Sequence, residues 1–248
     1  MKSLVLYFSE SSLQLIQVGS EKPLLRSIPI DMGKPFARDY ITEAIKEVLI
    51  DHQLEKILWF GADYTLFPLD LFDPNNLNSY YELNQGPIPA NCTLTYQILE
   101  KAGIVIIFSV PIWLYDYAKY ELQTTQLNHV VLMPLIQSFY QLNGNLVTII
   151  IENQHFVLTV LKEGKLQSIT TNDYQQNPDI LYFLLAQQQK IKLAQPVELH
   201  IFDATDLFDS EAFGALLKQF KDFENYHINF HSCSTYQNQI LCASLEVH

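Results

Sequence analysis

Glycine is scarce in this chain, with 8 residues in a total of 248. Loops that hold phosphate groups need glycine because the backbone must approach the phosphate closely. The sequence contains neither GxxxxGKS/T nor GxGxxG, the patterns typical of mononucleotide and dinucleotide binding. It also lacks the GxSxG pattern of serine hydrolases. These absences argue against the common phosphate-binding loops, and no catalytic residue can be assigned from a motif.

Basic residues are also few. Lysine and arginine total 15 against 27 acidic residues, which gives a net charge of −12 and a pI near 4.9. Such a charge repels phosphate backbones and anionic lipids. No apolar run approaches the roughly 20 residues that cross a bilayer. We therefore expect neither nucleic acid nor a membrane as a partner.

Cysteine is limited to 3 residues, an odd number without a recognisable disulfide framework. The apolar run near the N-terminus is too short for the core of a signal peptide and has no small-residue cleavage site. A reduced, cytoplasmic protein is the expectation from these two observations.

The chain does have enough apolar residues to form a large core, since 48% are hydrophobic and 17% are charged. Its most informative stretch is Leu146–Thr170, three apolar runs separated by two short polar joints. Runs rich in Val, Ile, Leu and Thr between turn residues indicate consecutive antiparallel strands. The same pattern opens the chain, at Leu4–Phe8, Leu13–Val18 and Leu24–Ile30.

An offset of 142 positions superimposes the two patterns, placing Leu4 on Leu146 and Glu10 on Glu152. This repeat predicts an α/β protein of two lobes, 1–143 and 144–248, each opened by a three-stranded antiparallel meander. Helical periodicity and capping residues predict helices at Phe36–Gln53, Pro111–Leu122, Pro134–Leu142, Asn177–Lys192 and Ser210–Phe220. Further strands are expected at Lys56–Gly61, Cys92–Leu99, Ile104–Val110, His129–Met133, Val197–Phe202 and Tyr226–Phe230.

Three segments carry a resemblance to a known family: FPLDLFD at Phe67–Asp73, VPIWL at Val110–Leu114 and NPDILYFLLAQQQKIKL at Asn177–Leu193. Together with the duplicated order of elements, the chain resembles the superfamily of actin, sugar kinases and heat-shock-70 ATPases. More narrowly, it is similar to an actin-like family common in Bacteroidetes that has no established activity. The resemblance implies ribonuclease-H-like lobes, mixed sheets and an actin-like ATPase architecture.

Members of that superfamily that hydrolyse ATP carry Asp-bearing and Gly-bearing turns in both lobes and a Gly-Gly pair that contacts adenosine. The corresponding turns here are Ser9–Ser12 and Glu152–Gln154, and neither contains Gly or Asp. The third position, Asp203–Asp206, has no Gly. The departures favour a protein that has lost nucleotide hydrolysis and binds no cofactor.

An alternative keeps a cofactor. If the lobes face each other across a cleft, Glu10, Glu152 and Asp203 could hold Mg²⁺ for a divergent, Mg-ATP-dependent phosphotransferase or ATPase, because Mg²⁺ prefers oxygen ligands. Ordinary solvated hairpin residues are the competing interpretation of the two glutamates. Asp209 is better explained as the N-cap of the helix that follows than as a metal ligand. No metal site is assigned, and a ribonuclease-H-like nuclease ranks last because the net charge opposes nucleic acid.

Aromatic residues supply the remaining functional signal. Tyrosines at positions 80, 81, 115 and 117 and Trp113 either pack in the core or mark a protein interface where they are exposed. We therefore expect a degenerate, non-catalytic member of the superfamily that acts in protein interaction or scaffolding. Its partner is an unknown protein, and a homodimer remains open.

Overall fold

A computed structural model describes residues 2–9, 12–17, 24–30, 37–122, 127–132, 144–152, 154–204 and 208–231. The chain divides into two compact units, Met1–Leu132 and Met133–His248. Residues 133–143, with the helix expected at Pro134–Leu142, lie outside the described ranges. The lobe boundary at Asn143 therefore stays a prediction.

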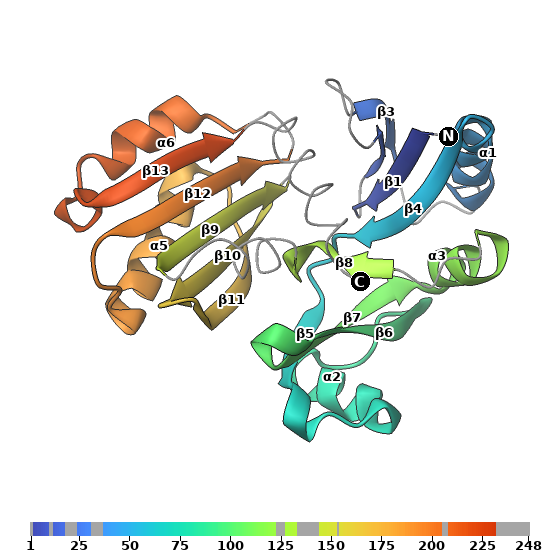
Figure 1. Ribbon diagram of the computed structural model, residues 1–248, viewed down its shortest axis with the longest axis horizontal. Coiled ribbons are helices and arrows are strands. Elements are labelled where there is room, and N and C mark those ends of the chain that lie inside the picture. The colour runs from blue at the N-terminus through green and yellow to red at the C-terminus, as the bar shows by residue number, and fades with distance from the viewer. Residues whose placement is uncertain are drawn as a thin grey trace. The chain divides into compact units, whose positions relative to one another are not determined.

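The first unit contains β1 (Lys2–Phe8), β2 (Ser12–Gln17), β3 (Leu24–Pro29), α1 (Ala37–Leu49), β4 (His52–Trp59), β5 (Tyr64–Pro68), α2 (Leu77–Gln85), β6 (Cys92–Leu99), β7 (Ile104–Pro111), α3 (Ile112–Asp116) and β8 (Leu127–His129). They form a five-stranded mixed sheet in the order β3-β2-β1-β4-β8 and a separate antiparallel sheet in the order β5-β7-β6 (Figure 1). The small sheet is an insertion between β4 and β8.

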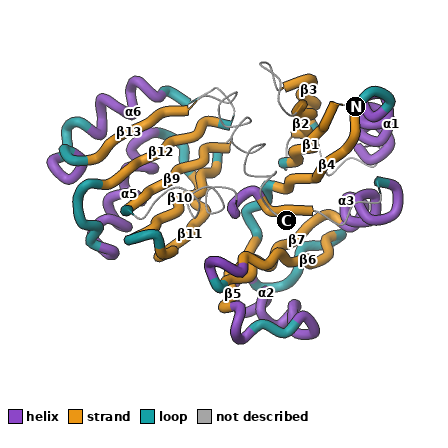
Figure 2. Tube along the Cα trace, in the orientation of Figure 1, coloured by secondary structure: helices purple, strands orange, loops and turns teal. Residues whose placement is uncertain are grey.

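The second unit contains β9 (Asn145–Glu152), β10 (His155–Lys162), β11 (Lys165–Asp173), α5 (Asn177–Ile191), β12 (Val197–Asp203), α6 (Ser210–Leu217) and β13 (Tyr226–His231). Its sheet has the order β11-β10-β9-β12-β13, which repeats the order of the first unit. In both units the first strand of the meander pairs in parallel with the strand after the first helix. The predicted duplicated α/β fold with two meanders is confirmed, and Figure 2 shows the same elements along the chain trace.

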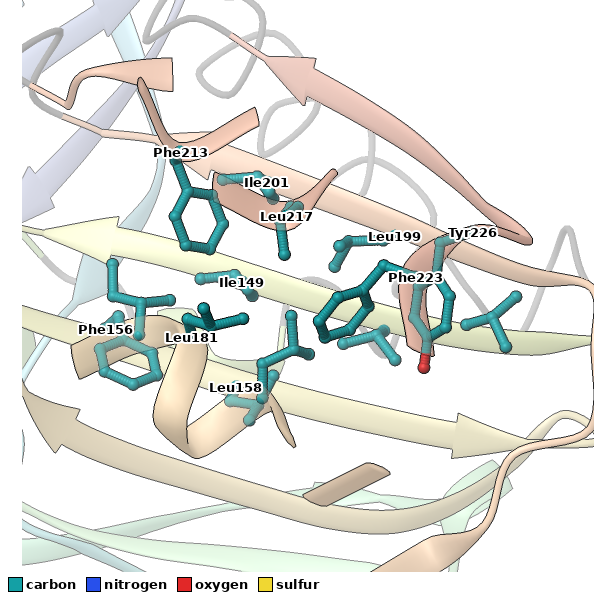
Figure 3. Packing of buried hydrophobic residues seen from close by; sticks show 14 of the residues in the cluster. Ile149, Phe156, Leu158, Leu181, Leu199, Ile201, Phe213, Leu217, Phe223 and Tyr226 are labelled. Carbon is teal, nitrogen blue, oxygen red and sulfur yellow. The ribbon is translucent and has the colours of Figure 1, made fainter. Parts of the chain in front are cut away.

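The core of the second unit lies between α5, α6 and one face of the sheet. Alternate residues of β9, among them Ile149 and Ile151, point to this side, as do Leu199 and Ile201 of β12. Figure 3 shows Ile149, Leu199 and Ile201 among side chains of α5, α6 and the segment before β13. Phe213 of α6 is fully buried in the same cluster. Burial of large apolar side chains on this scale is the main force that holds α5 and α6 on the sheet.

Local capping explains where the helices of this unit begin. The carboxylate of Asp209 accepts a hydrogen bond from the Ala212 N–H at 2.9 Å, which confirms Asp209 as the N-cap of α6. The sequence favours Asn177 as the N-cap of α5, but Asn177 is the first helical residue and Gln176, one position earlier, is the N-cap. Asp179 accepts from the Gln176 N–H at 3.0 Å, so the first-turn carboxylate stabilises this start.

The strand expected at His129–Met133 is wrong. Strand β8 ends at His129, and Val130–Leu132 forms a 3-10 turn. The apolar run there reflects burial, since Val130 and Val131 are fully enclosed. A short apolar run cannot distinguish a buried strand from a buried turn by composition alone.

Candidate functional site: the strand ends of the two units

The hairpin turn after β1 is closed by its own hydrogen bonds. The Ser9 N–H donates to the Ser12 carbonyl at 2.8 Å, and the Ser12 N–H donates to Ser9 Oγ at 3.1 Å. The two hydroxyl oxygens lie 2.9 Å apart and share a further hydrogen bond. Ser9 is 1% exposed. The described N–H groups of this turn are therefore used within the turn and are not directed at a ligand.

The last residue of β4, which lies beside this turn, is the aromatic Trp59. Trp59 is buried, and its indole N–H donates to the Ser109 carbonyl of β7 at 3.0 Å. A Cβ atom built at Gly61 would lie 2.6 Å from Trp59 Nε1, so glycine leaves room for the indole. This position of β4 therefore joins the large sheet to the inserted one.

Gly61→Ala tests that contact. The added methyl group must displace the indole ring, and we expect the free energy of unfolding to fall by about 1–3 kcal/mol, as is usual for overpacking a close-packed interior. Gly214→Ala is the matched control, because a Cβ there would meet the Phe230 ring at an ordinary 3.5 Å. In a helix that control should be neutral or stabilising by up to about 1 kcal/mol. Urea unfolding of both variants measures the difference, and equal stabilities would contradict it.

His129 is a second buried polar link in the first unit. It is 0% exposed, its Nε2 lies 3.1 Å from the Gly61 carbonyl, and its Nδ1 lies 3.3 Å from the Val131 N–H. Because Nδ1 must accept from that N–H, the proton of the neutral ring resides on Nε2 and is donated to Gly61. Burial lowers the pKa of His129 to about 3, against the opposing effect of the Gly61 hydrogen bond. A neutral imidazole packed against Tyr64 and Phe108 is a structural group here.

The strand ends of the second unit carry carboxylates. Glu152 at the end of β9 is 2% exposed, and Asp203 at the end of β12 is 9% exposed. Asp203 accepts a hydrogen bond from the Phe208 N–H at 2.9 Å, which holds the segment leading to α6. Burial raises the pKa of Tyr174, and the negative charges of Asp203 and then Glu152 raise it further. The charges of both carboxylates therefore act on this partly buried phenol.

Strand pairing shows that the two carboxylates leave the sheet on different sides. Asp203 pairs with Ile151, so it shares the face that α5 and α6 cover. Glu152 is the next residue of β9 and by alternation points to the opposite face. No group of three or more His, Cys, Asp or Glu residues suited to a metal ion occurs within the described ranges.

The equivalence expected between Glu10 and Glu152 is displaced by one residue. Ser9 and Ser12 close the first hairpin, as Glu152 and His155 close the second. Ser9 therefore corresponds to Glu152, one position beyond the offset seen in the sequence. Trp59 pairs with Phe8, the residue before Ser9, and Asp203 pairs with Ile151, the residue before Glu152. Trp59 therefore corresponds to Asp203. A hydroxyl and an indole thus stand in the first unit where carboxylates stand in the second.

Of the predicted site residues, Glu152 and Asp203 lie on neighbouring strands of one unit, and Glu10 lies outside the described ranges. Sequence reasoning missed the Trp59 and His129 contacts to the inserted sheet. The only sequence signal for these contacts is His129, a histidine within an apolar run. Among the aromatic candidates, Tyr81 and Tyr117 are buried in the core.

Comparisons with known proteins place this geometry in a fold class. The chain is similar to a crystal structure from Bacteroides thetaiotaomicron described as a protein with an actin-like ATPase fold and unknown function, at 18% identity and a TM-score of 0.74, covering 100% of this chain and 96% of that one. It is also similar to the cytoplasmic domain of EpsL, an inner-membrane component of the type II secretion system of Vibrio cholerae (9% identity, TM-score 0.54, coverage 100% and 96%). A third similar structure is the PilM–PilN type IV pilus biogenesis complex (13%, 0.52, 100% and 99%).

The fold is that of the actin-like ATPases. Residues 46–227 match the model of a family described as a protein of unknown function, DUF3822, and the chain belongs to this family. No curated protein matches the sequence. Within the described ranges, no helix is both long and apolar enough to cross a bilayer.

Proposed function

We propose that this protein is a degenerate, non-catalytic member of the actin-like fold that acts as a protein-interaction element. The observation that carries the proposal is the hairpin turn of the first unit. Its described N–H groups, those of Ser9 and Ser12, donate within the turn. A phosphate cradle needs backbone N–H groups that are free to donate to the ligand, and it needs glycine for close approach.

The described residues at these strand ends do not fit the phosphates of a nucleotide. The turn residue that pairs at the end of β1 is a buried serine, and the end of β4 beside it is occupied by Trp59. The second unit places Asp203 on a backbone N–H before α6, where it stabilises the fold. Two of the similar structures are named as parts of multi-protein machines, which is consistent with an interaction role.

The alternative, a divergent Mg-dependent phosphotransferase or ATPase, has one observation in its favour. Glu152 and Asp203 are buried carboxylates at the ends of adjacent parallel strands, and ligands of open α/β sheets bind at the carboxyl ends of strands. Their placement on opposite faces of the sheet weakens the case for one shared cation. The same experiment separates the two functions.

Thermal melting with and without millimolar Mg-ATP or Mg-ADP is that experiment. A ligand at 100 times its dissociation constant would stabilise the folded state by about 2.7 kcal/mol and raise Tm by roughly 2–4 °C. We expect a change below about 1 °C, with Mg²⁺ alone and with ATP plus EDTA as controls. A magnesium-dependent rise that Glu152→Gln abolishes would overturn the non-catalytic proposal in favour of the alternative.

A further inference from the structure

The inserted sheet has one edge strand without the usual protection against pairing. Natural edge strands carry lysine, proline or a bulge, which prevents another strand from adding to them. Strand β6 has the sequence CTLTYQIL, which contains no charged residue and no proline. Its pairing with β7 is continuous over all eight residues, without a register shift. On its outer side no strand of the described chain pairs with it.

The opposite edge of the same sheet is protected. Strand β5 ends in Pro68 and is covered by side chains of α2. The Asn84 amide donates to Thr65 Oγ1 at 2.8 Å, and the Gln85 amide donates to the Tyr64 carbonyl. Among the described residues, the sheet therefore has one protected edge, at β5, and one edge to which no further strand is added, at β6.

Exposed apolar side chains accompany the open edge. Tyr96 and Ile98 of β6 are 37% and 42% exposed, and Leu71 is 68% exposed. Phe72 follows Leu71 in the chain, and its ring centroid lies 4.9 Å from that of Tyr96. We call these four residues the β6 edge patch. Tyr96 and Ile98 lie on the α2 side of the sheet, since they pair with Ile107 and Val105, both members of the core cluster under α2. Phe72 packs against the same cluster.

The other face of β6 is anchored, so the edge is already in place before a partner binds. Gln97 Oε1 accepts a hydrogen bond from the His129 N–H of β8 at 3.1 Å. A preformed edge lowers the ordering cost of association. Strand addition then supplies main-chain hydrogen bonds for affinity and side-chain contacts for specificity.

The charge of the inserted segment indicates the charge of the partner. The inserted segment, residues 63–111, contains a single basic residue and several acidic ones: Lys101 against Asp63, Asp70, Asp73, Glu82 and Glu100. Two copies of this chain pairing through β6 would bring like charges together, which disfavours self-association. A basic partner would instead gain in association rate and in specificity.

We propose that β6 accepts, as an added strand, an extended segment of a partner protein in which apolar residues alternate with lysine or arginine. The apolar side chains of that segment cover the β6 edge patch, and its basic side chains face the acidic surroundings. This assignment rests on the proposed interaction function and names the surface and the class of partner that it requires.

The test uses the full chain and a defined probe. The probe is a fluorescein-labelled twelve-residue peptide in which valine and isoleucine alternate with lysine and threonine. One comparison peptide carries glutamate for lysine, and another has proline at two central positions, which removes main-chain donors. Fluorescence anisotropy measures the affinity, and hydrogen exchange followed by mass spectrometry locates the contact.

We expect the basic peptide to bind and to slow amide exchange across Cys92–Leu99 while leaving Tyr64–Pro68 unchanged. Ile98→Lys should raise Kd at least about tenfold, because a lysine at the edge opposes both burial and the basic partner. Tyr96→Lys is a second variant in case the first fails to fold. The matched control is Leu83→Lys, which adds the same charge at an exposed position of α2 and should change Kd less than about twofold.

Three results would overturn the proposal: no binding of the basic peptide at 1 mM, binding without slower exchange in β6, or equal affinity for the glutamate peptide. A dimer in sedimentation velocity that Ile98→Lys dissociates would replace the basic partner with a second copy. The nucleotide melting experiment reports on the proposed function separately. If the peptide binds and Mg-ATP also stabilises the protein, the β6 binding surface is retained and the non-catalytic function is rejected. If the peptide does not bind and Mg-ATP does not stabilise the protein, the β6 binding surface is rejected and the non-catalytic function is retained.

Discussion

Between pH 7 and pH 5, His129 alone is expected to lower the free energy of unfolding by about 2 kcal/mol. Burial lowers the pKa of this imidazole to about 3, whereas the unfolded chain has the ordinary value of 6.5. In this pH range the unfolded state takes up a proton that the folded state does not, so stability falls as the pH falls. The loss begins near pH 6.5 and continues to about pH 3.

Urea unfolding at pH 7, 6 and 5 measures this dependence, and His129→Gln isolates it. Glutamine offers an amide N–H near the position of Nε2 and does not titrate, so the variant should lose about 2 kcal/mol less over the same range. Burial also lowers the pKa values of His200 and His231, which therefore contribute in the same direction. The contribution of His129 is the difference in pH dependence between the wild type and His129→Gln. Parallel curves for wild type and His129→Gln would contradict the prediction.

Phe213→Ala is expected to destabilise the second unit by about 3–5 kcal/mol, because it removes a fully buried aromatic ring from the centre of the α5–α6 core. The ring belongs to one cluster with residues of the sheet and makes an edge contact with Phe208. Hydrogen exchange of the native protein measures the effect by location. Protection should fall in β9, β12 and both helices.

Tyr182→Ala is the control for that change. Tyr182 belongs to α5 of the same unit but is 68% exposed, so its removal should cost less than about 1 kcal/mol. Equal losses from the two variants would show that the cluster in Figure 3 is not the main source of stability in this unit. A loss of protection spread evenly over the first unit would show that the two units unfold together.

The elements were predictable where their pattern is local. The two meanders, the hairpin of β6 and β7 and the start of α6 at Asp209 follow from runs, turns and caps that lie within about twenty residues. The place of β5 does not, because it pairs with β7 some forty residues later in the chain. The sequence could identify the β6–β7 hairpin but not the third strand that makes it a sheet.

The one-residue displacement between the two hairpins has a physical cause. Strands β1 and β9 lie in the middle of their sheets and are buried on both faces, so they read as continuous apolar runs. A run without alternation does not indicate which residues face which side of the sheet. Two alignments of the repeats that differ by one residue therefore fit the apolar pattern equally well. Only the paired residues at the turns, Ser9 with Ser12 and Glu152 with His155, determine the correspondence. The expected equivalence of Glu10 with Glu152 is displaced for this reason.

The open edge of β6 also bears on the order in which the protein folds and on how it is best produced. The β6–β7 hairpin closes through Glu100–Gly103, so it can form within microseconds of that segment becoming available. The parallel pairing of β1 with β4 joins residues about fifty positions apart and must come later. An unprotected strand is therefore exposed throughout the slower assembly. If β6 accepts the partner segment proposed above, co-expression with that segment should raise the soluble yield of this chain.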